Sequence, residues 1–392
     1  METLLGKYGE EGNKLIFKIL KRGEHEHTRE PDLALRYDLT VPLARVVAQY
    51  QNELPKFFKR YQIQPVWRAD RPAKGRFREF FQCDIDAIGS TSPVVEAEIL
   101  GAISEILIAL GFADFMIRLN HRAVLSAGIP EARQADALVA IDKLDKIGVD
   151  GVTRELAARG IDARAAEQCL LFMQCGPAER PDAIIARLGN TLVGHLAVVE
   201  LATIAALAES TPAAGRIRID PSLARGLSYY TGAIMEVSVP DLAGSLGGGG
   251  RYDNLIGMFL GRDVPACGFS LGLERIIVVM TERNMFPASV AGGGVDVLVT
   301  IWNDETRADA LALAGELRRA GLRVDVYPEA DKLGKQFKYA SSRSVPFVAI
   351  VGDDERSRGE VAVKDLRTGE QKSVPRANAA AYLRTQNVER RT

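Results

Sequence analysis

The stretch WRADRPAKGRFREFFQCDID, residues 67–86, decides the fold because two alternating segments flank a charged loop. Successive side chains of a strand point to opposite faces. On the second segment the even positions are polar or aromatic: Arg76, Arg78, Phe80, Gln82, Asp84 and Asp86. The odd positions from Phe77 to Ile85 are mostly apolar, and the first segment keeps this parity from Arg60 to Arg68. We therefore predict a β-hairpin whose odd face is core and whose even face is functional.

The composition of the even face favours a binding site. An ordinary solvated sheet face also alternates, but it usually carries Lys, Glu and Thr. Here arginines, glutamines and acids share a face with Phe80. Arginine forks suit phosphate or carboxylate groups, and a lone aromatic suits a flat base. The mixture indicates a nucleotide site.

Composition limits the other possibilities. A chain of 392 residues with 47% apolar content is long enough for two or three domains. The net charge of −1 confines nucleic-acid contacts to local basic patches and argues against DNA binding. Four cysteines without CxxC spacing are typical of a reduced, cytoplasmic protein. Neither a signal peptide nor a membrane span is apparent, so we expect no membrane partner.

Residues 33–50, LALRYDLTVPLARVVAQY, change from a strand period to a helical period near Thr40. We expect a strand that runs directly into a helix, with Pro42 in the first turn. Thr40 could cap this helix, and Asp38 could place a charge near its positive end. Alternatively, the two side chains bind an ammonium group. Both interpretations stay open at this point.

The middle of the chain alternates between helical and strand-rich parts. Residues 121–215 are Ala- and Leu-rich with helical spacing, which predicts a helical insertion. Strands then resume, and the glycine run 244–250 is either a flexible linker or a backbone that approaches a ligand closely. Its place inside a domain favours the second interpretation. Residues 266–280 predict a strand and then a helix whose first turn carries Glu274 and Arg275, a suitable anion site.

The C-terminal part forms a separate pattern. Residues 287–294, PASVAGGG, predict a linker. From residue 295 strand and helix patterns alternate, and a final strand pair is expected around Glu360 to Lys364. This order predicts a small α/β domain with a largely parallel sheet.

Several stretches in the right order resemble one family, the histidyl-tRNA synthetases, which are class II aminoacyl-tRNA synthetases. The segment at 58–89 resembles motif 2, and GFSLGLERI at 268–276 resembles motif 3. Two further stretches resemble motifs peculiar to the histidine enzymes: RGLSYYTG at 225–232 and GGGGRYD at 247–253. KLGKQFKYA at 332–340 resembles part of the anticodon-binding domain. The resemblance covers nearly the whole chain.

The resemblance implies a fold and a division into domains. We expect an α+β catalytic domain of the class II type, built on an antiparallel sheet from residues 1–120 and 216–286. A helical insertion occupies residues 121–215. The linker at 287–294 leads to an α/β anticodon-binding domain at 295–392.

The resemblance also implies roles for individual residues. The histidine pocket is expected to contain Asp38, Thr40, Gln82, Asp86, Arg225, Tyr229, Tyr230 and Gly249. The ATP site is expected to contain Arg68, Asp70, Arg76, Phe80 and Arg275. Arg68 and Arg225 are the expected catalytic residues, and Phe80 stacks on adenine. The imidazole is held by Asp86 and Tyr230, and the ammonium group by Asp38, Thr40 and Gln82. Asp70 or Glu274 helps to place Mg²⁺.

The implied activity is ATP-dependent activation of histidine and its transfer to tRNA(His), with Mg²⁺. Family members carry several dozen residues ahead of the position of Met1, including motif 1, which builds much of their dimer interface. We therefore expect a truncated chain of a true synthetase that is a homodimer at full length. Ser228 also departs from the family pattern, which tends to have aspartate there.

Three alternatives remain: a histidine-sensing regulatory subunit, an inactive truncated paralogue and an RNA-binding protein that only shares the fold. Regulatory paralogues generally lack the anticodon-type domain and lose the catalytic arginines. This chain keeps the domain pattern together with Arg68, Arg225 and Arg275. We therefore favour the ligase.

Overall fold

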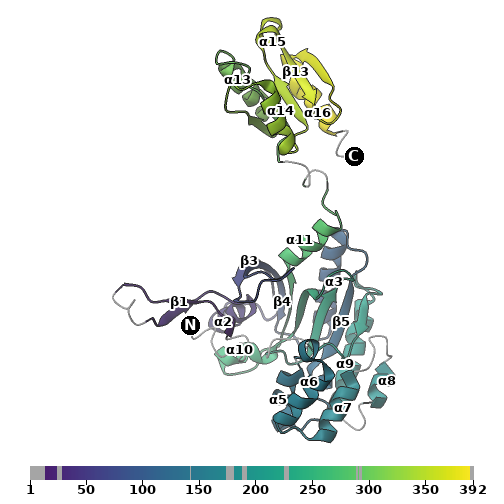
Figure 1. The fold of residues 1–392 in the computed structure, drawn as a ribbon. Coiled ribbons are helices and arrows are strands. Elements are labelled where there is room, and N and C mark those ends of the chain that lie inside the picture. The colour runs from purple at the N-terminus through teal and green to yellow at the C-terminus, as the bar shows by residue number, and fades with distance from the viewer. Residues whose placement is uncertain are drawn as a thin grey trace. The chain divides into compact units, whose positions relative to one another are not determined.

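The computed structural model describes residues 14–23, 29–141, 143–173, 181–187, 192–224, 229–287, 290 and 294–388. The chain divides into two compact units, Met1–Arg283 and Asn284–Thr392 (Figure 1). Arg225 and Ser228 lie outside the described residues, as does most of the predicted linker at 287–294.

A seven-stranded sheet forms the centre of the first unit, in the order β3-β4-β9-β8-β7-β5-β6. Its strands are β3 (Phe58–Trp67), β4 (Glu79–Ile88), β5 (Met116–His121), β6 (Ile217–Ile219), β7 (Ala233–Ser238), β8 (Ser245–Arg251) and β9 (Ala266–Gly272). All neighbouring strands are antiparallel except β5 and β6. The predicted antiparallel catalytic sheet is confirmed.

Strands β3 and β4 form the predicted hairpin, paired over ten residues each. The prediction that its odd face is core is wrong. Tyr61 is 78% exposed and Ile63 is 55% exposed, whereas Asp84 and Asp86 are only 2% and 5% exposed. The even face is covered because it forms the floor of a pocket, while the odd face of the edge strand β3 lies open.

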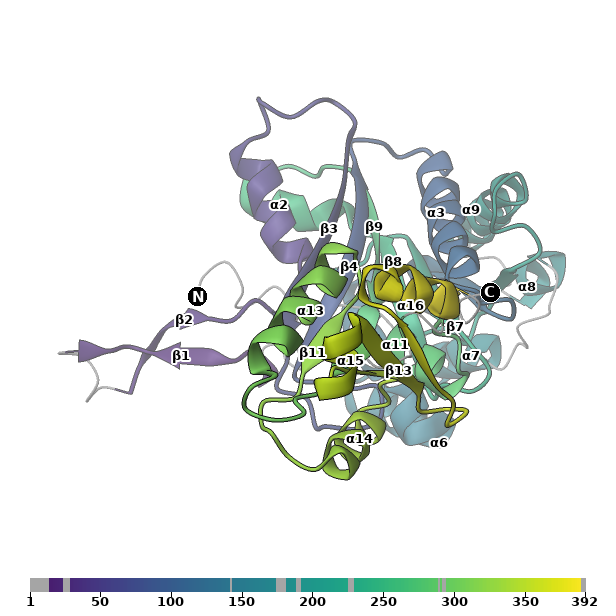
Figure 2. The same ribbon diagram turned by 90° about the horizontal axis from the view of Figure 1, so that it is seen from above.

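Helices pack against the sheet of the first unit and against one another. α3 (Val94–Ala109) packs against β4 and β9, and α9 (Leu192–Ala208) packs against α3, β5 and β6 (Figure 2). α2 (Thr40–Gln49) packs against α10 (Asp253–Leu260). α11 (Leu273–Glu282) follows β9 directly and contacts β4.

The segment between β5 and β6 is helical, as its spacing predicted. Its helices are α4 (Arg122–Leu125), α5 (Glu131–Ile141), α6 (Leu144–Ala158), α7 (Ala163–Met173), α8 (Pro181–Arg187) and α9. Gly160, with φ +72°, ends α6, and Gly148, with φ +67°, kinks it. Because α9 packs on α3 as well as on α4 and α8, it joins this helical segment to the sheet.

The N-terminal strands β1 (Lys18–Leu20) and β2 (Pro31–Ala34) form a two-stranded arm that extends from the unit in both views (Figures 1 and 2). The predicted strand up to Leu39 is wrong, since β2 ends at Ala34. The chain turns at Asp38, whose carboxylate accepts a hydrogen bond from the Val41 N–H and so starts α2.

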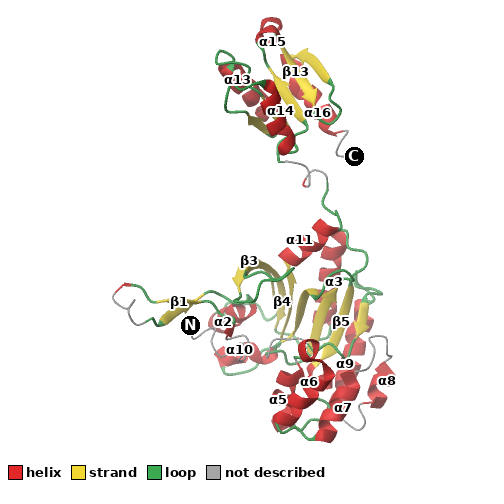
Figure 3. Cartoon of the chain, in the orientation of Figure 1, coloured by secondary structure: helices red, strands yellow, loops and turns green. Residues whose placement is uncertain are grey.

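The second unit has a five-stranded sheet in the order β11-β10-β12-β13-β14. Figure 3 shows β13 of this sheet together with the helices α13, α14, α15 and α16. The strands are β10 (Val297–Val299), β11 (Val324–Val326), β12 (Phe347–Ile350), β13 (Glu360–Asp365) and β14 (Gln371–Pro375). The helices are α13 (Arg307–Arg319), α14 (Leu333–Ser342), α15 (Asp353–Arg358) and α16 (Ala379–Val388). β10 is parallel to β11 and β12, whereas β12 pairs antiparallel with β13 and β13 with β14. The prediction of a largely parallel sheet is therefore wrong, because the final strand pair makes the sheet mixed. None of the helices described in either unit is long and apolar enough to cross a membrane.

Candidate active site

A pocket of about 360 Å³ opens above the even face of β4. It brings together every predicted site residue that the structure describes: Asp38, Thr40, Arg68, Asp70, Arg76, Phe80, Gln82, Asp86, Tyr229, Tyr230, Gly249, Glu274 and Arg275. Arg225 is the exception, since it lies outside the described residues. The individual roles of these residues remain predictions.

Asp38 contacts the start of α2 and also lines the pocket, and its binding of an ammonium group stays a prediction. Its Oδ1 accepts a hydrogen bond from the Val41 N–H at 3.2 Å, so the carboxylate caps α2. Its Oδ2 accepts from the Tyr229 hydroxyl at 3.3 Å and faces the pocket. Thr40 is the first residue of the helix and does not cap it. Its hydroxyl therefore remains a candidate for substrate binding.

Asp86 is held by two residues that the sequence did not single out. Arg60 contacts its Oδ2 through Nε at 3.0 Å and through Nη2 at 2.9 Å. The Tyr252 hydroxyl donates to Oδ1 at 2.5 Å. Burial raises the pKa of Asp86, and both contacts oppose this rise because they favour the ionised form.

Arg68 lies between two aromatic rings at the other end of the hairpin. Its guanidinium carbon is 4.3 Å from the Tyr37 ring centre and 5.1 Å from that of Phe80. Its Nε donates to the Tyr37 carbonyl at 3.1 Å. These contacts fix the guanidinium plane at the mouth of the pocket, where a phosphate could bind.

Arg275 fastens the hairpin loop to the centre of the sheet. Its Nε donates to the Gly75 carbonyl at 2.8 Å, and its Nη1 donates to the Ser245 carbonyl at 2.6 Å. Gly75 has φ +68°, a conformation that favours glycine. The neighbouring Glu274 carboxylate accepts from the Phe81 N–H at 2.9 and 3.0 Å. The first turn of α11 therefore contacts both the hairpin loop at Gly75 and strand β4 at Phe81.

The glycine run is a central strand of the sheet, which the sequence did not predict. A Cβ on Gly249 would lie 2.2 Å from the Gly268 carbonyl oxygen, so strand β9 excludes a side chain there. At Gly248 the nearest atom is the Met235 oxygen at 3.4 Å, and this position lines the pocket. The absence of a side chain therefore allows strand pairing at Gly249, and at Gly248 it leaves part of the pocket floor bare, so the close approach of a ligand stays a prediction.

Three tyrosines form one wall. The ring of Tyr229 lies edge-on to Tyr230, with centres 5.1 Å apart, and to Tyr252, with centres 6.2 Å apart. Burial is the main reason that the pKa of Tyr230 is raised. The hydroxyl group of Tyr230 therefore stays protonated and can act as a donor at neutral pH.

Comparison with known proteins decides the family, because a histidyl-tRNA synthetase family model matches residues 1–276. The chain belongs to the histidyl-tRNA synthetase family. A second model, that of the anticodon-binding domain, matches residues 296–386. Both matches agree with the motifs on which the resemblance rested.

Individual relatives of the family agree with this membership. A histidine–tRNA ligase of Porphyromonas gingivalis is 44% identical and covers 98% of this chain, which spans 89% of it. The histidine–tRNA ligase of Christiangramia forsetii is 41% identical and covers 95% of this chain, which spans 87% of that protein. The crystal structure of histidyl-tRNA synthetase from Nostoc sp. PCC 7120 matches with a TM-score of 0.73 at 32% identity. The match covers 98% of this chain and 89% of the Nostoc chain.

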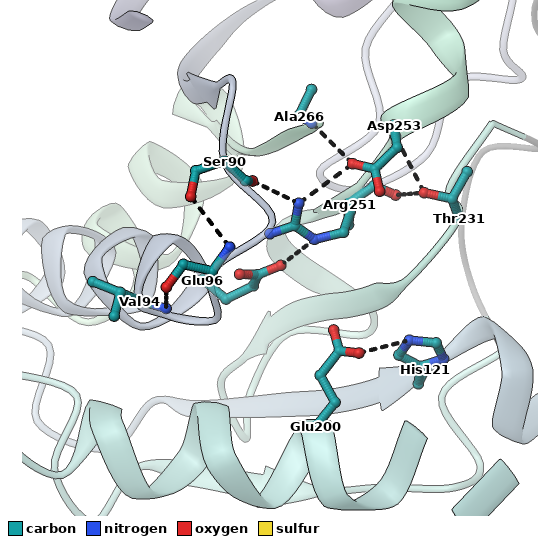
Figure 4. A network of polar contacts seen from close by, with 10 residues as sticks. Ser90, Val94, Glu96, His121, Glu200, Thr231, Arg251, Asp253 and Ala266 are labelled. Atoms are coloured by element: carbon teal, nitrogen blue, oxygen red, sulfur yellow. Dashed lines mark hydrogen bonds and ion pairs between the residues drawn. The ribbon is translucent and has the colours of Figure 1, made fainter. Parts of the chain in front are cut away.

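The GGGGRYD motif of this synthetase family also builds a buried polar network behind the pocket (Figure 4). Arg251 pairs with Glu96 at 2.7 Å and donates to the Ser90 carbonyl at 3.0 Å and to Asp253 at 3.3 Å. The Asp253 N–H in turn donates to the Thr231 hydroxyl at 3.1 Å. Arg251 precedes Tyr252, and Thr231 follows Tyr230. The network therefore fixes the backbone on both sides of the tyrosine wall.

His121 lies at the edge of this network, 3.7 Å from Glu200 (Figure 4). Burial, and then the nearby Arg251, lowers the pKa of His121 to about 4. The imidazole is therefore neutral at pH 7, and its contact with Glu200 is not an ion pair.

Sequence reasoning missed three residues that line the pocket, Asp84, Tyr252 and Ser270, and it missed Arg60 as the partner of Asp86. The signal for Asp84 was present, since it shares the parity of Gln82 and Asp86. Ser270 lies opposite Asp84 in the register of β4 and β9, and it accepts a hydrogen bond from the Gln82 amide at 2.8 Å.

Proposed function

We propose that this chain is a histidine–tRNA ligase. It activates histidine with ATP to histidyl-adenylate, releases pyrophosphate, and transfers histidine to the 3′ end of tRNA(His). The observation that carries the proposal is the arrangement of charges along β4 within one pocket. Asp84 and Asp86 lie toward one end of the strand, and Arg68 lies beside Phe80 at the other.

This arrangement suits an amino acid and a nucleotide placed end to end. The acidic end, with Asp38 and the tyrosine wall, offers acceptors and donors to an ammonium group and an imidazole. The basic end offers arginine forks to phosphates and the Phe80 ring to a base. The carboxylate of histidine would then meet the α-phosphate of ATP between the two ends.

The activation step needs no protein nucleophile, because the substrate carboxylate itself attacks the α-phosphate. The site supplies alignment and positive charge for the transition state. In the described part of the chain only Nε of Arg68 is hydrogen-bonded, so its terminal nitrogens can bind the phosphate. We propose Arg225 of the RGLSYYTG motif as the second cation at this point.

The carboxylates of Asp70 and Glu274 fit a magnesium ion that accompanies ATP. Proteins commonly hold Mg²⁺ through one or two carboxylates together with substrate phosphates. Both side chains line the pocket at its basic end, and Glu274 is oriented by the Phe81 N–H. The bound ion would neutralise phosphate charge and orient the nucleotide.

The remaining parts of the proposal concern partners and location. The second unit would bind tRNA, because it matches anticodon-binding domains. The protein would be a homodimer in the cytoplasm. The exposed apolar side chains of Tyr61 and Ile63 on the edge strand support a dimer, since such surfaces commonly pack against a partner.

The test is exchange of labelled pyrophosphate into ATP with each amino acid in turn. We expect exchange with histidine. Exchange with another amino acid and none with histidine would refute the specificity. Histidine binding without exchange would favour the regulatory subunit instead.

Two variants test the division of labour. Arg225→Ala should abolish adenylate formation with the fold intact, whereas Arg218→Ala, on the exposed part of β6, should not. Normal turnover of the first variant would remove Arg225 from the catalytic residues. Truncation before residue 287 should spare pyrophosphate exchange and weaken aminoacylation. An equal loss of both would contradict the assignment of tRNA binding to the second unit.

A further inference from the structure

Asp84 places another carboxyl on the floor of the pocket. Its side chain lies between those of Gln82 and Asp86 on the same face of β4 and is 2% exposed. Residues two apart on a strand are separated by roughly 6.7 Å, which is enough for two carboxyls to flank a small ring. In the register of the sheet, Asp84 is opposite Gln62 of β3 and Ser270 of β9.

The two neighbouring aspartates differ in their partners. Asp86 is engaged by Arg60 and Tyr252. Within the described part of the chain, Asp84 forms no ion pair, and its side chain meets Ser270 and the Gln82 amide, the latter at 3.5 Å. Asp84 is therefore the carboxyl with remaining hydrogen-bonding capacity.

A second observation also indicates a ligand at this place. Gln82 is 7% exposed and lines the pocket, and no donor among the described residues reaches its Oε1. A buried amide oxygen without a donor costs free energy unless a ligand or water supplies one. Gln82 therefore leaves an amide acceptor unused, and Asp84 beside it retains hydrogen-bonding capacity.

The surroundings determine the protonation of Asp84. Burial and then Asp86 raise the pKa of Asp84 to about 8, against the opposing effects of Ser270 and Arg60, and Asp38 adds to the rise. Two adjacent buried carboxyls resist joint ionisation, and Arg60 stabilises the charge on Asp86. At neutral pH Asp84 is therefore the neutral member of the pair and carries a proton to donate.

We propose that Asp84 binds the imidazole of the substrate histidine in the place expected of Tyr230, donating a hydrogen bond to one ring nitrogen while Asp86 accepts the N–H of the other. This inference rests on the proposed function. A neutral imidazole has one donor and one acceptor nitrogen, and a neutral and an ionised carboxyl match them. Side chains without both groups would leave one aspartate unpaired and buried, which gives selectivity.

The test is calorimetric binding of histidine to the full chain and to three variants. Asp84→Ala should raise the Kd for histidine at least about tenfold, with the KM for ATP unchanged. Asp84→Asn, which keeps an N–H donor, should recover most of this loss. Glu79→Ala removes an exposed carboxylate from the same strand and is the matched control, with no change in Kd.

The pH dependence separates this role from a structural one. The wild type should lose affinity for histidine above about pH 8, as Asp84 ionises and its proton is lost. Asp84→Asn should not lose affinity over this range. An unchanged Kd in Asp84→Ala, or the same pH profile in wild type and Asp84→Asn, would overturn the role of Asp84 alone. A wild type that does not bind histidine would overturn the proposed function as well.

Discussion

Replacing Asp84 with asparagine should stabilise the protein at neutral pH. The pKa of this carboxyl rises from 3.8 to about 8 in the folded state, chiefly through burial. Between these values the unfolded chain releases the proton and the folded chain keeps it, so wild-type stability falls as pH rises. Each pKa unit corresponds to about 1.4 kcal/mol, which sets an upper limit of about 6 kcal/mol. Replacing buried ionic groups with uncharged side chains has stabilised other proteins by about 1–4 kcal/mol, so we expect a gain in the free energy of unfolding within this range.

The assay can report on the first unit alone, because the chain has two tryptophans, Trp67 and Trp302, one in each unit. In a Trp302→Phe background, fluorescence follows thermal unfolding around β3. The gain in Tm of Asp84→Asn should be absent near pH 4, grow up to about pH 8 and then level off. Glu79→Gln serves as the control without such a trend. A gain that does not change with pH, or a loss at pH 7, would show that Asp84 is not a neutral buried carboxyl.

Three further outcomes follow from contacts around the pocket. Gly249→Ala should destabilise the first unit by about 1–3 kcal/mol, because its Cβ would lie 2.2 Å from a β9 carbonyl, whereas Gly248→Ala should change the Tm little. Equal effects of the two substitutions in thermal unfolding would contradict this. Arg251→Lys should break the contact between Nε and Glu96, cost about 3–5 kcal/mol and raise the KM for histidine, as measured by unfolding and exchange kinetics. Arg275→Ala should raise the KM for ATP at least about tenfold, since the loop loses its tether; an unchanged KM would refute that tether.

The sequence could predict which residues share a face of the hairpin, because alternation is a local geometric property. It could not predict which face is covered. Tyr61 and Ile63 have largely apolar side chains and are nevertheless exposed, whereas Asp84 has an ionisable side chain and is buried. The reason is that the segments that bury one face of the hairpin are distant from it in the sequence. Likewise, the glycine run lacks the side chains that mark a strand, and only its pairing with β7 and β9 shows that it is one. Motif resemblance located the pocket residues without revealing these contacts.

Asp84 and Asp86 show why residue type alone does not assign chemistry within the pocket. They are the same amino acid, two positions apart on one face, so sequence pattern treats them alike. The difference comes from Arg60, 26 residues from Asp86, and Tyr252, 166 residues from it. These two partners favour a charge on Asp86 and leave Asp84 neutral beside it. The pair can then present an ionised acceptor to one nitrogen of a ring and an O–H donor to the other.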